Sequence, residues 1–245
     1  MLNRFKKNFL DTLFPIACLS CAKDGVWLCE RCLKKISLRS FQVCPLCEQI
    51  ISACGKICPD CRKRKPPLDY LLVAANYQEK YITKIVHLYK YNFLESLAAP
   101  LGKIMLLSFM QNDFPLPDLI IPVPLHPRRL RWRGFNQSEL LANYIGENLT
   151  PGLVIPILKN ILIRKKDTAP QMQVKNYKDR RENIRNAFAV QNPSGILNKN
   201  ILLIDDIATT GSTLFECARV LKESGAKKIY GAVISRQESR KQAST

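Results

Sequence analysis

The segment from Ile201 to Leu214, ILLIDDIATTGSTL, constrains the fold of this chain more than any other. It opens on an unbroken apolar run, which predicts a strand buried on both faces. Two acids follow, and a turn then leads into a helix that we expect to begin near Thr213. Backbone N–H groups of such a turn, together with the positive end of the helix dipole, can bind an anion, and Gly211 lets the backbone approach closely. The segment therefore predicts a phosphate site formed by Thr209, Thr210, Gly211, Ser212 and Thr213.

The acids Asp205 and Asp206 serve a different purpose. They are placed to accept hydrogen bonds from ribose hydroxyls or to reach a magnesium ion through water. Taken singly, paired acids also cap helices, and T-T-G also forms an ordinary turn. The whole string, however, resembles the signature of type I phosphoribosyltransferases, an apolar run followed by D-D-x-x-T-T-G-x-T. The resemblance implies a phosphoribosyl pyrophosphate site with magnesium, in which Asp205 and Asp206 are the catalytic residues.

Short β-type runs alternate with longer helical runs in the rest of the chain, which predicts an α/β fold, a mainly parallel sheet flanked by helices. We expect strands at Tyr70 to Tyr77, Leu119 to Val123, part of Val154 to Arg164, Asn200 to Asp205, and Lys228 to Ile234. We expect helices at Ile82 to Tyr91, Glu95 to Met110, Gln137 to Asn148, and Thr213 to Ser224. Two polar stretches, Pro124 to Asn136 and Lys165 to Arg185, are expected as loops at the carboxyl ends of strands, where ligands bind.

Nine of the ten cysteines lie between Cys18 and Cys61, and eight of them form C-x-x-C pairs. Two such pairs complete a tetrahedral four-thiolate shell that suits zinc. We expect a structural role, because a segment with few large apolar residues needs the metal to fold; a disulfide framework and a catalytic metal are the other readings. Sequential pairing gives two zinc ribbons, interleaved pairing is the alternative, and Cys54 is a spare thiol or a substitute for Cys58. The expected ligands are Cys18, Cys21, Cys29, Cys32, Cys44, Cys47, Cys58 and Cys61.

A basic, proline-containing stretch from Arg62 to Pro67 follows the cysteines and marks a boundary between two compositions. We therefore predict a cysteine-rich zinc-ribbon domain at residues 1–65 and a phosphoribosyltransferase-like domain at residues 66–245. A short basic and apolar stretch before Cys18 loosely resembles a signal peptide. Because that stretch is broken by Asp11 and Pro15, and because Cys18 already has Cys21 as a partner, we expect an uncleaved cytoplasmic chain with reduced thiols.

Net charge is the second unusual property, since 38 Lys and Arg against 20 Asp and Glu give +18. Such a balance favours polyanionic partners, either nucleic acid or phosphate-rich small molecules. No stretch approaches the roughly 20 apolar residues that a transmembrane helix needs.

A cluster of arginines follows the second predicted strand, in the run LIIPVPLHPRRLRWRGFNQSELL from Leu119 to Leu141. Several guanidinium groups can hold a pyrophosphate by bidentate hydrogen bonds, and they can equally hold a nucleic-acid backbone. Nearby aromatic residues either stack on bases or pack in the core. The arginines are Arg128, Arg129, Arg131 and Arg133, and the aromatic residues are Trp132, Phe135 and Tyr177.

The run P-V-P-L-H-P-R-R-L-R-x-R-G-F-N-Q resembles the ComF family of competence proteins. The resemblance covers nearly the whole chain, including the C-x-x-C pairs, Lys90-Tyr91, Thr168-x-x-Gln171, Arg180-Arg181-x-Asn183 and Ala187-Phe188. It implies a zinc module fused to a phosphoribosyltransferase fold that acts in bacterial natural transformation. The implied partners are phosphoribosyl pyrophosphate, single-stranded DNA, and proteins of DNA uptake or recombination.

Two functions remain open at this stage. A competence protein would bind phosphoribosyl pyrophosphate and hold single-stranded DNA, with the basic hinge Arg62 to Lys65 as a further contact. The alternative is an active phosphoribosyltransferase of nucleotide metabolism, with an unknown acceptor and no role in DNA uptake. We favour the competence role; whether the site turns over is left open by the sequence. His126 is expected to be structural or a phosphate contact.

Overall fold

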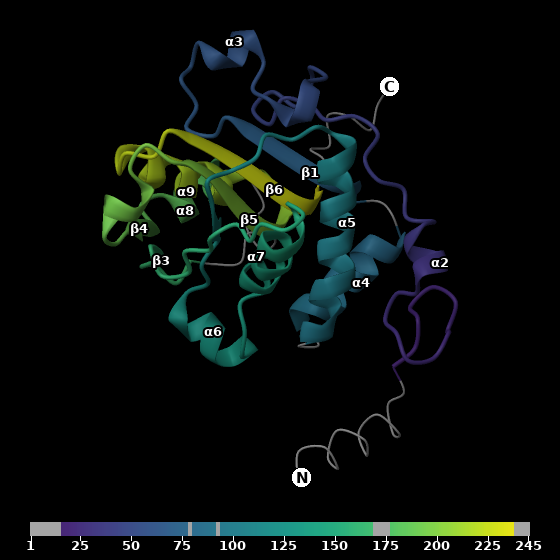
Figure 1. Cartoon of the computed structure of the whole chain (residues 1–245). Coiled ribbons are helices and arrows are strands. Elements are labelled where there is room, and N and C mark those ends of the chain that lie inside the picture. Colours follow the sequence, from purple (N-terminus) through teal and green to yellow (C-terminus); the bar gives the residue numbers. More distant parts are fainter. Residues whose placement is uncertain (1–15, 78–79, 92–93, 169–176, 238–245) are drawn as a thin grey trace.

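The computed structural model describes residues 16–77, 80–91, 94–168 and 177–237, and its centre is a four-stranded sheet (Figure 1). The strands are β1 (Tyr70–Asn76), β2 (Leu119–Pro122), β5 (Asn200–Ala208) and β6 (Lys228–Arg236). Their order is β1-β6-β5-β2, and every neighbouring pair is parallel. The predicted α/β architecture is confirmed.

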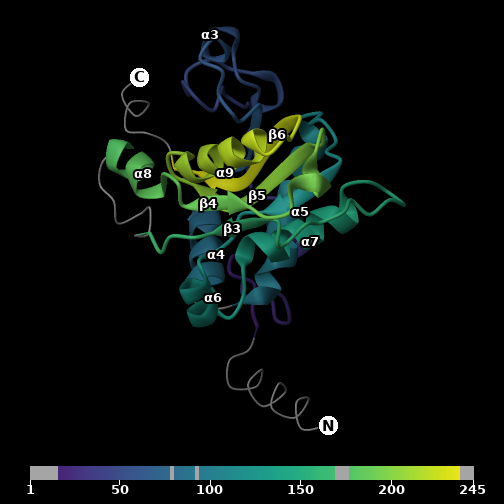
Figure 2. The same ribbon diagram turned by 90° about the vertical axis from the view of Figure 1, so that its left-hand side faces the viewer.

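Helices cover both faces of the sheet, as Figures 1 and 2 show from two sides. One face carries α4 (Lys80–Tyr91), α5 (Ala98–Gln111) and α7 (Gln137–Asn148). The other carries α8 (Tyr177–Ile184), α9 (Ser212–Glu223) and a small two-stranded antiparallel sheet of β3 (Leu162–Arg164) and β4 (Phe188–Val190). The short helices are α2 (Glu30–Leu33), α3 (Pro59–Arg62), α6 (Pro127–Arg133), and the 3-10 turns η1 (Ala53–Gly55), η2 (Glu95–Leu97) and η3 (Pro193–Ile196).

Strict alternation along the strands builds two separate apolar cores. In β5, Leu202 and Ile204 pack on the α5 and α7 side, while Ile201 and Leu203 pack on the α9 side. All four side chains are fully buried. Truncation of one such side chain to alanine costs about 2–5 kcal/mol, so this pattern fixes the strand and holds its carboxyl end, where the acids lie.

The boundaries of some elements differ from those expected from sequence. β5 continues through both acids to Ala208, because β6 pairs with it over that whole length. The segment expected as one helix from Glu95 is a 3-10 turn followed by α5, which begins at Ala98. Pro100 lies in the first turn of α5, where a missing N–H removes no intrahelical hydrogen bond. Helix α7 has the expected bounds.

The prediction of a loop from Pro124 to Asn136 is wrong, because the stretch contains helix α6. His126 is the N-cap, and its Nδ1 accepts a hydrogen bond from the N–H of Arg128 at 3.3 Å. Pro127 is the first helical residue, and Gly134 ends the helix at φ 81°. These cap signals were present in the sequence, but the helix buries no residue and therefore shows no apolar period.

The second predicted loop, Lys165 to Arg185, is also wrong in part, because it contains α8. Among the α8 side chains that the structure describes, Ile184 is the one buried in the core, which is too little to show a helical period. Residues 169–176, including Gln171, lie outside the described residues, as do residues 1–15 of the N-terminal stretch.

Two stretches of the cysteine-rich segment, one around Leu38 and one around Lys56, run along the outer edge of β1. Leu38 pairs with Ala75, and Lys56 pairs with Tyr70, both in antiparallel bridges. The side-chain amide of Gln42 donates to the Val73 carbonyl at 3.1 Å, and its oxygen accepts from the Val73 N–H at 3.0 Å. The edge of the sheet is thus covered rather than left open to pairing. The division at residues 65 and 66 stays a prediction.

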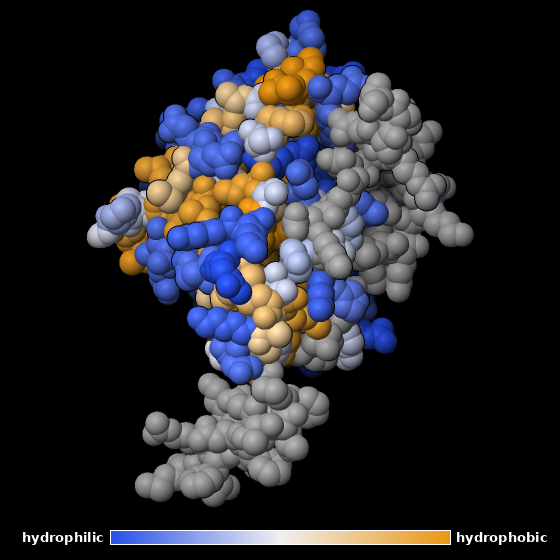
Figure 3. Space-filling view, turned by 90° about the vertical axis from the view of Figure 1, so that its right-hand side faces the viewer, coloured by the Kyte–Doolittle hydropathy of each residue, from blue (hydrophilic) through white to orange (hydrophobic). Residues whose placement is uncertain are grey.

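The two cysteine groups lie at different places around the sheet (Figure 1). The first, with α2, lies beside α5, where Lys103 and Glu30 form an ion pair at 2.5 Å and Trp27 donates to Ser96 at 2.7 Å. The second, with α3, lies over β1. The surface drawn in Figure 3 mixes apolar and hydrophilic residues, and no helix among the described residues is long and apolar enough to cross a membrane.

Candidate functional site

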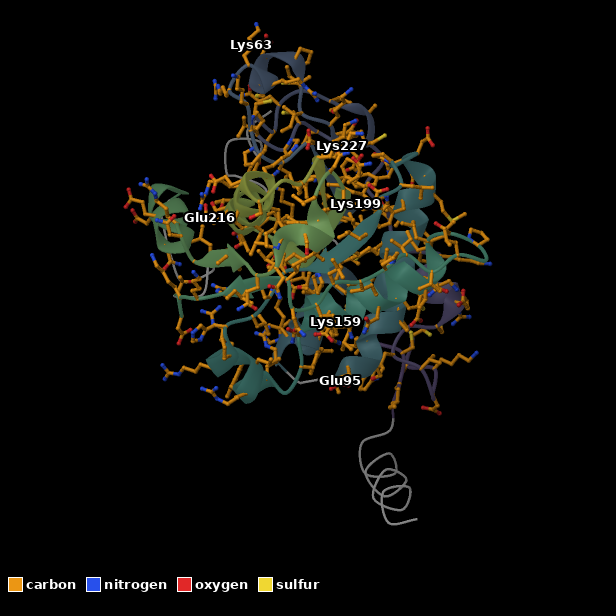
Figure 4. The ribbon with its side chains drawn as sticks, turned by 60° about the vertical axis from the view of Figure 1, so that its left-hand side comes forward. Lys63, Glu95, Lys159, Lys199, Glu216 and Lys227 are labelled. Carbon is orange, nitrogen blue, oxygen red and sulfur yellow. The ribbon has the colours of Figure 1, made fainter. Side chains whose placement is uncertain are left out.

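A cleft of about 140 Å³ opens at the carboxyl ends of β2 and β5. It is lined by Lys90, Val123, Pro124, Leu125, Arg129, Arg133, Gln137, Ser138, Arg164, Asp205, Asp206, Ile207, Ala208, Thr209, Gly211, Ser212, Thr213 and Leu214. Lys199 and Lys227 mark the opposite, amino-terminal ends of β5 and β6 in Figure 4, where the Lys227 N–H donates to the Lys199 carbonyl at 2.9 Å. The cleft therefore lies where parallel sheets bind ligands.

The two acids are held by partners from distant helices. Ser138 Oγ donates to Asp205 Oδ1 at 3.0 Å, and the Asp206 N–H donates to the same oxygen at 2.9 Å. Lys90 Nζ lies 2.9 Å from Asp206 Oδ1, and both side chains of this ion pair are largely buried. Asp205 and Asp206, which both line the cleft, are thereby held in place.

The pKa of the Asp205 carboxyl group is shifted into the neutral range. Burial, and after it the neighbouring charge of Asp206, raise its pKa from the ordinary value of 3.8 to about 7, although the charge of Lys90 opposes both effects. A carboxyl group of this kind changes charge near neutral pH. Such perturbed acids in a cleft are typical of functional sites.

The turn after β5 forms the side of the cleft next to helix α9. Gly211 is the N-cap of α9 and has φ 76°, a conformation that favours glycine. Thr210 Oγ1 lies 2.7 Å from Ser212 Oγ and accepts from the Ser212 N–H at 3.3 Å. Thr209, Gly211, Ser212 and Thr213 line the cleft, so the amino end of α9 is presented to any anion bound there.

The four predicted arginines separate onto two faces of α6. Arg129 and Arg133 are one helical turn apart and line the cleft, where Arg133 Nη1 donates to Gln137 Oε1 at 2.8 Å. Arg128 and Arg131 are exposed and do not line it. Two of the four predicted arginines therefore line the cleft, and the helical period explains the separation.

Sequence reasoning did not assign site roles to Lys90, Ser138 or Arg164. Arg164 ends β3 and donates through Nη2 to Thr168 Oγ1, while Arg129 donates to the Thr168 carbonyl. Burial lowers the pKa of Arg164, and the charge of Arg129 lowers it further. The Nε of Arg164 is buried and has no hydrogen-bond partner among the described residues. The rule that ligands bind at strand carboxyl ends was the available signal for Arg164.

The aromatic residues considered for base stacking also separate. Phe135 is buried in the core, with its ring 5.9 Å from that of Tyr89, so it is unavailable for stacking. Trp132 is 62% exposed on α6. The side chain of Tyr177 lies outside what the structure describes.

The eight paired cysteines form two groups, Cys18/Cys21/Cys29/Cys32 and Cys44/Cys47/Cys58/Cys61. Within each group, all four Sγ atoms lie within 4.8 Å of one another. This is the sequential pairing, not the interleaved one. Cys54 belongs to neither group, and its Sγ contacts the Asn112 carbonyl at 2.8 Å. Four converging thiols with no open position fit a tetrahedral zinc ion in each group.

The parallel sheet, the acids at the end of β5 and the phosphate turn before α9 together define the class of protein: a type I phosphoribosyltransferase fold. In agreement, residues 136–244 match the family model described as "Phosphoribosyl transferase domain".

Comparison with characterised proteins narrows the class to a family. The chain is 32% identical to competence protein F of Haemophilus influenzae in an alignment of 227 residues that covers 88% of this chain and 95% of the relative. It is 30% identical to competence protein ComFC of Bacillus subtilis, covering 87% and 91% of the two chains, and 29% identical to DNA utilization protein YhgH of Escherichia coli O157:H7, covering 81% and 92%. The chain belongs to the ComF family.

Among solved structures, the chain aligns with a purine phosphoribosyltransferase from Pyrococcus horikoshii at 18% identity and a TM-score of 0.32, covering 58% of this chain and 83% of that one.

Proposed function

We propose that this ComF protein acts in natural transformation, binding phosphoribosyl pyrophosphate with magnesium in the cleft and single-stranded DNA on the adjoining surface. One observation carries the proposal. The paired acids, the phosphate turn and the inward-facing arginines line a single cleft, although they come from three separate parts of the fold: β5 with the turn after it, α6 and β3.

Each part of the cleft matches one part of phosphoribosyl pyrophosphate. The turn from Thr209 to Thr213 would bind the 5-phosphate through its N–H groups and hydroxyls. Asp205 and Asp206 would accept hydrogen bonds from the ribose hydroxyls. Arg129 and Arg164 would hold the pyrophosphate by bidentate hydrogen bonds. Magnesium, when bound with this ligand, would neutralise part of the charge on the pyrophosphate.

If the bound molecule reacts, the bond between C1 of the ribose and the pyrophosphate oxygen breaks, and a bond from C1 to an acceptor forms. The arginines stabilise the charge that develops on the leaving pyrophosphate, and the acids hold the ribose in place.

Binding of DNA is supported by the outward face of α6. Arg131 and Trp132 follow Arg128 by three and four residues, which places all three on one side of the helix. All three are exposed, Arg128 at 79% and Trp132 at 62%. A positive surface with an exposed aromatic ring is the usual platform for single strands. The net charge of +18 favours the same partner.

Zinc is proposed as a structural ion in both cysteine groups. The second group contains only a small apolar cluster, centred on Ile57 and packed by Leu46. A core of that size cannot fold a segment without further stabilisation, which the metal supplies.

Neighbouring arginines on α6 provide a matched test, because Arg129 faces the cleft and Arg128 faces solvent. We expect Arg129→Ala to weaken binding of phosphoribosyl pyrophosphate about tenfold or more, since hydrogen bonds to charged groups contribute about 1.5–3 kcal/mol. Arg128→Ala should leave that affinity unchanged and should instead weaken the binding of single-stranded DNA. Isothermal titration with magnesium and fluorescence anisotropy with an oligonucleotide measure the two affinities. Equal effects of the two variants on both ligands would contradict the proposal.

The alternative, an active enzyme of nucleotide metabolism without a DNA role, predicts a different result. Release of pyrophosphate in the presence of a free base, together with no measurable affinity for single-stranded DNA, would favour it.

A further inference from the structure

Arg236 connects three distant parts of the chain. It is the last residue of β6 and is only 4% exposed. Its Nη1 donates to the Pro45 carbonyl at 3.1 Å, and its Nη2 lies 2.5 Å from Glu48 Oε1 and 3.2 Å from the Thr210 carbonyl. One planar guanidinium therefore joins the second cysteine group to the phosphate turn.

The contact on the cleft side holds the turn itself. Arg236 pairs with Ala208 across the sheet, at the point where β5 leads into the turn. A Cβ added to Gly211 would lie 3.6 Å from Arg236 Nη2, so the guanidinium lies directly behind the turn. Its hydrogen bond fixes the carbonyl of Thr210 and with it the peptide plane between Thr210 and Gly211. The residues on either side of that plane, Thr209, Gly211, Ser212 and Thr213, line the cleft where a phosphate would bind.

The contact on the other side depends on the geometry of the second cysteine group. Pro45 lies between Cys44 and Cys47, and Glu48 follows directly. The Glu48 N–H donates to the Cys44 carbonyl at 2.9 Å, which closes a tight turn, and Glu48 adopts the left-handed conformation at φ 59°. Two thiolates on one ion would hold this turn closed. The same turn presents both oxygen atoms that bind Arg236.

We infer that Arg236 is a positioning residue through which zinc in the second cysteine group holds the phosphate turn in its anion-binding conformation. The first cysteine group has no such connection among the described residues, since its side chains reach α5 and η2 instead, through the Glu30–Lys103 ion pair and the Trp27–Ser96 hydrogen bond. The inference rests on the proposed phosphoribosyl pyrophosphate site and on zinc as the structural ion. It gives the two groups different roles, although their ligand sets are identical.

The two groups supply matched variants, because Cys47 and Cys21 each hold the second position of the first pair and are both partly exposed. In the full-length, zinc-loaded protein we expect Cys47→Ser to lower the affinity for phosphoribosyl pyrophosphate about tenfold, which is the effect of losing one charged hydrogen bond. Cys21→Ser should leave the affinity within a factor of about two. Arg236→Met should reproduce the loss, and combining it with Cys47→Ser should add little, because both changes break one connection.

A second measurement does not depend on the ligand. Hydrogen–deuterium exchange of the amides from Thr209 to Ser212 should accelerate in Cys47→Ser and in Arg236→Met, and not in Cys21→Ser. Arg236→Lys keeps the charge but cannot reach all three oxygens, so it should restore little of the protection. If Arg236→Met does not fold, the comparison of the two cysteine variants stands alone.

Unchanged exchange and affinity in Cys47→Ser would overturn the inference, and so would equal effects of Cys47→Ser and Cys21→Ser. If the wild-type protein binds no phosphoribosyl pyrophosphate, the proposed function fails, and the exchange measurement still decides whether the second cysteine group holds the turn.

Discussion

Asp205 should make the protein less stable at neutral and alkaline pH than it would be with an amide in its place. The carboxyl group lies in β5 directly after four fully buried residues, and it stands next to the largely buried Asp206. Its pKa is raised from 3.8 to about 7 by burial first and by the charge of Asp206 second. The folded protein therefore holds the proton on this group more tightly than the unfolded chain does.

The sign of the effect follows from that difference. Below about pH 3.8 the group is protonated in both states, and it contributes nothing. Between that pH and about 7 the unfolded chain releases the proton while the folded protein retains it, so the free energy of unfolding falls as the pH rises. Above about pH 7 both states are ionised and the whole penalty is present. The change from 3.8 to about 7 corresponds to at most about 4 kcal/mol. Because Asp205 is partly exposed, water screens part of this, and we expect about 1–2 kcal/mol.

Asp205→Asn removes the charge and keeps an oxygen that can accept from Ser138 and from the Asp206 N–H. Urea unfolding followed by circular dichroism, with zinc present, should show the variant about 1–2 kcal/mol more stable than the wild type at pH 8. The advantage should shrink steadily as the pH falls from 7 toward 4. Asp60→Asn, at an exposed residue paired with Lys63, serves as the control and should change stability by less than about 0.5 kcal/mol at every pH. A variant that is no more stable at pH 8, or whose advantage does not depend on pH, would refute the reasoning.

Three further predictions concern stacking, packing and the metal. Trp132→Ala should weaken the binding of single-stranded DNA by about 1–3 kcal/mol, measured by fluorescence anisotropy. Leu130→Ala, at an exposed neighbour on the same helix, is the control, and an equal loss of DNA affinity there would argue against stacking. Phe135→Ala should lower the free energy of unfolding by about 3–5 kcal/mol in urea, because the ring is buried in the core; a smaller loss accompanied by weaker DNA binding would return Phe135 to the DNA surface. Chelation of zinc should add an early calorimetric transition and also lower the midpoint temperature of the main one, because the chain after the first cysteine group pairs with β1. A main transition whose midpoint does not move would show that the edge of the sheet is stable without the cysteine-rich segment paired to it.

Local signals in the sequence were sufficient for the part of the site made by consecutive residues. The apolar run, the two acids and the glycine from Ile201 to Leu214 form one strand, one turn and the start of one helix, so their order along the chain is enough to predict that they lie together. Spacing was likewise sufficient for the cysteine groups, since each C-x-x-C pair is itself a turn. Helix α6 was missed because it packs too little apolar surface to show a period, although Pro127 and Gly134 marked its ends.

Lys90, Ser138 and Arg164 could not be assigned in this way, because their approach to the acids is decided by the packing of whole elements. Ser138 is 67 residues from Asp205 along the chain, and it meets that carboxyl group only when α7 packs on β5 and β2. Arg236 is a stronger case: its partners lie 188 and 26 residues away. Only the order of the strands, with β6 between β1 and β5, brings the second cysteine group and the phosphate turn to the same guanidinium.

Charged groups within the fold differ in whether the protein itself satisfies them, and the difference marks the cleft. Glu216 is also buried, but it accepts from the Asn186 N–H at 2.7 Å and binds Arg219, so its pKa is lowered despite burial. Asp205 and Arg164 behave oppositely: burial and a neighbouring like charge shift the pKa of each toward its neutral form. Their charges are therefore not fully balanced by the described residues. A ligand with phosphate groups would complete the partners of Arg164, and its hydroxyls or its bound cation would complete those of Asp205. The same unbalanced charges that reduce stability are what the cleft offers to such a ligand.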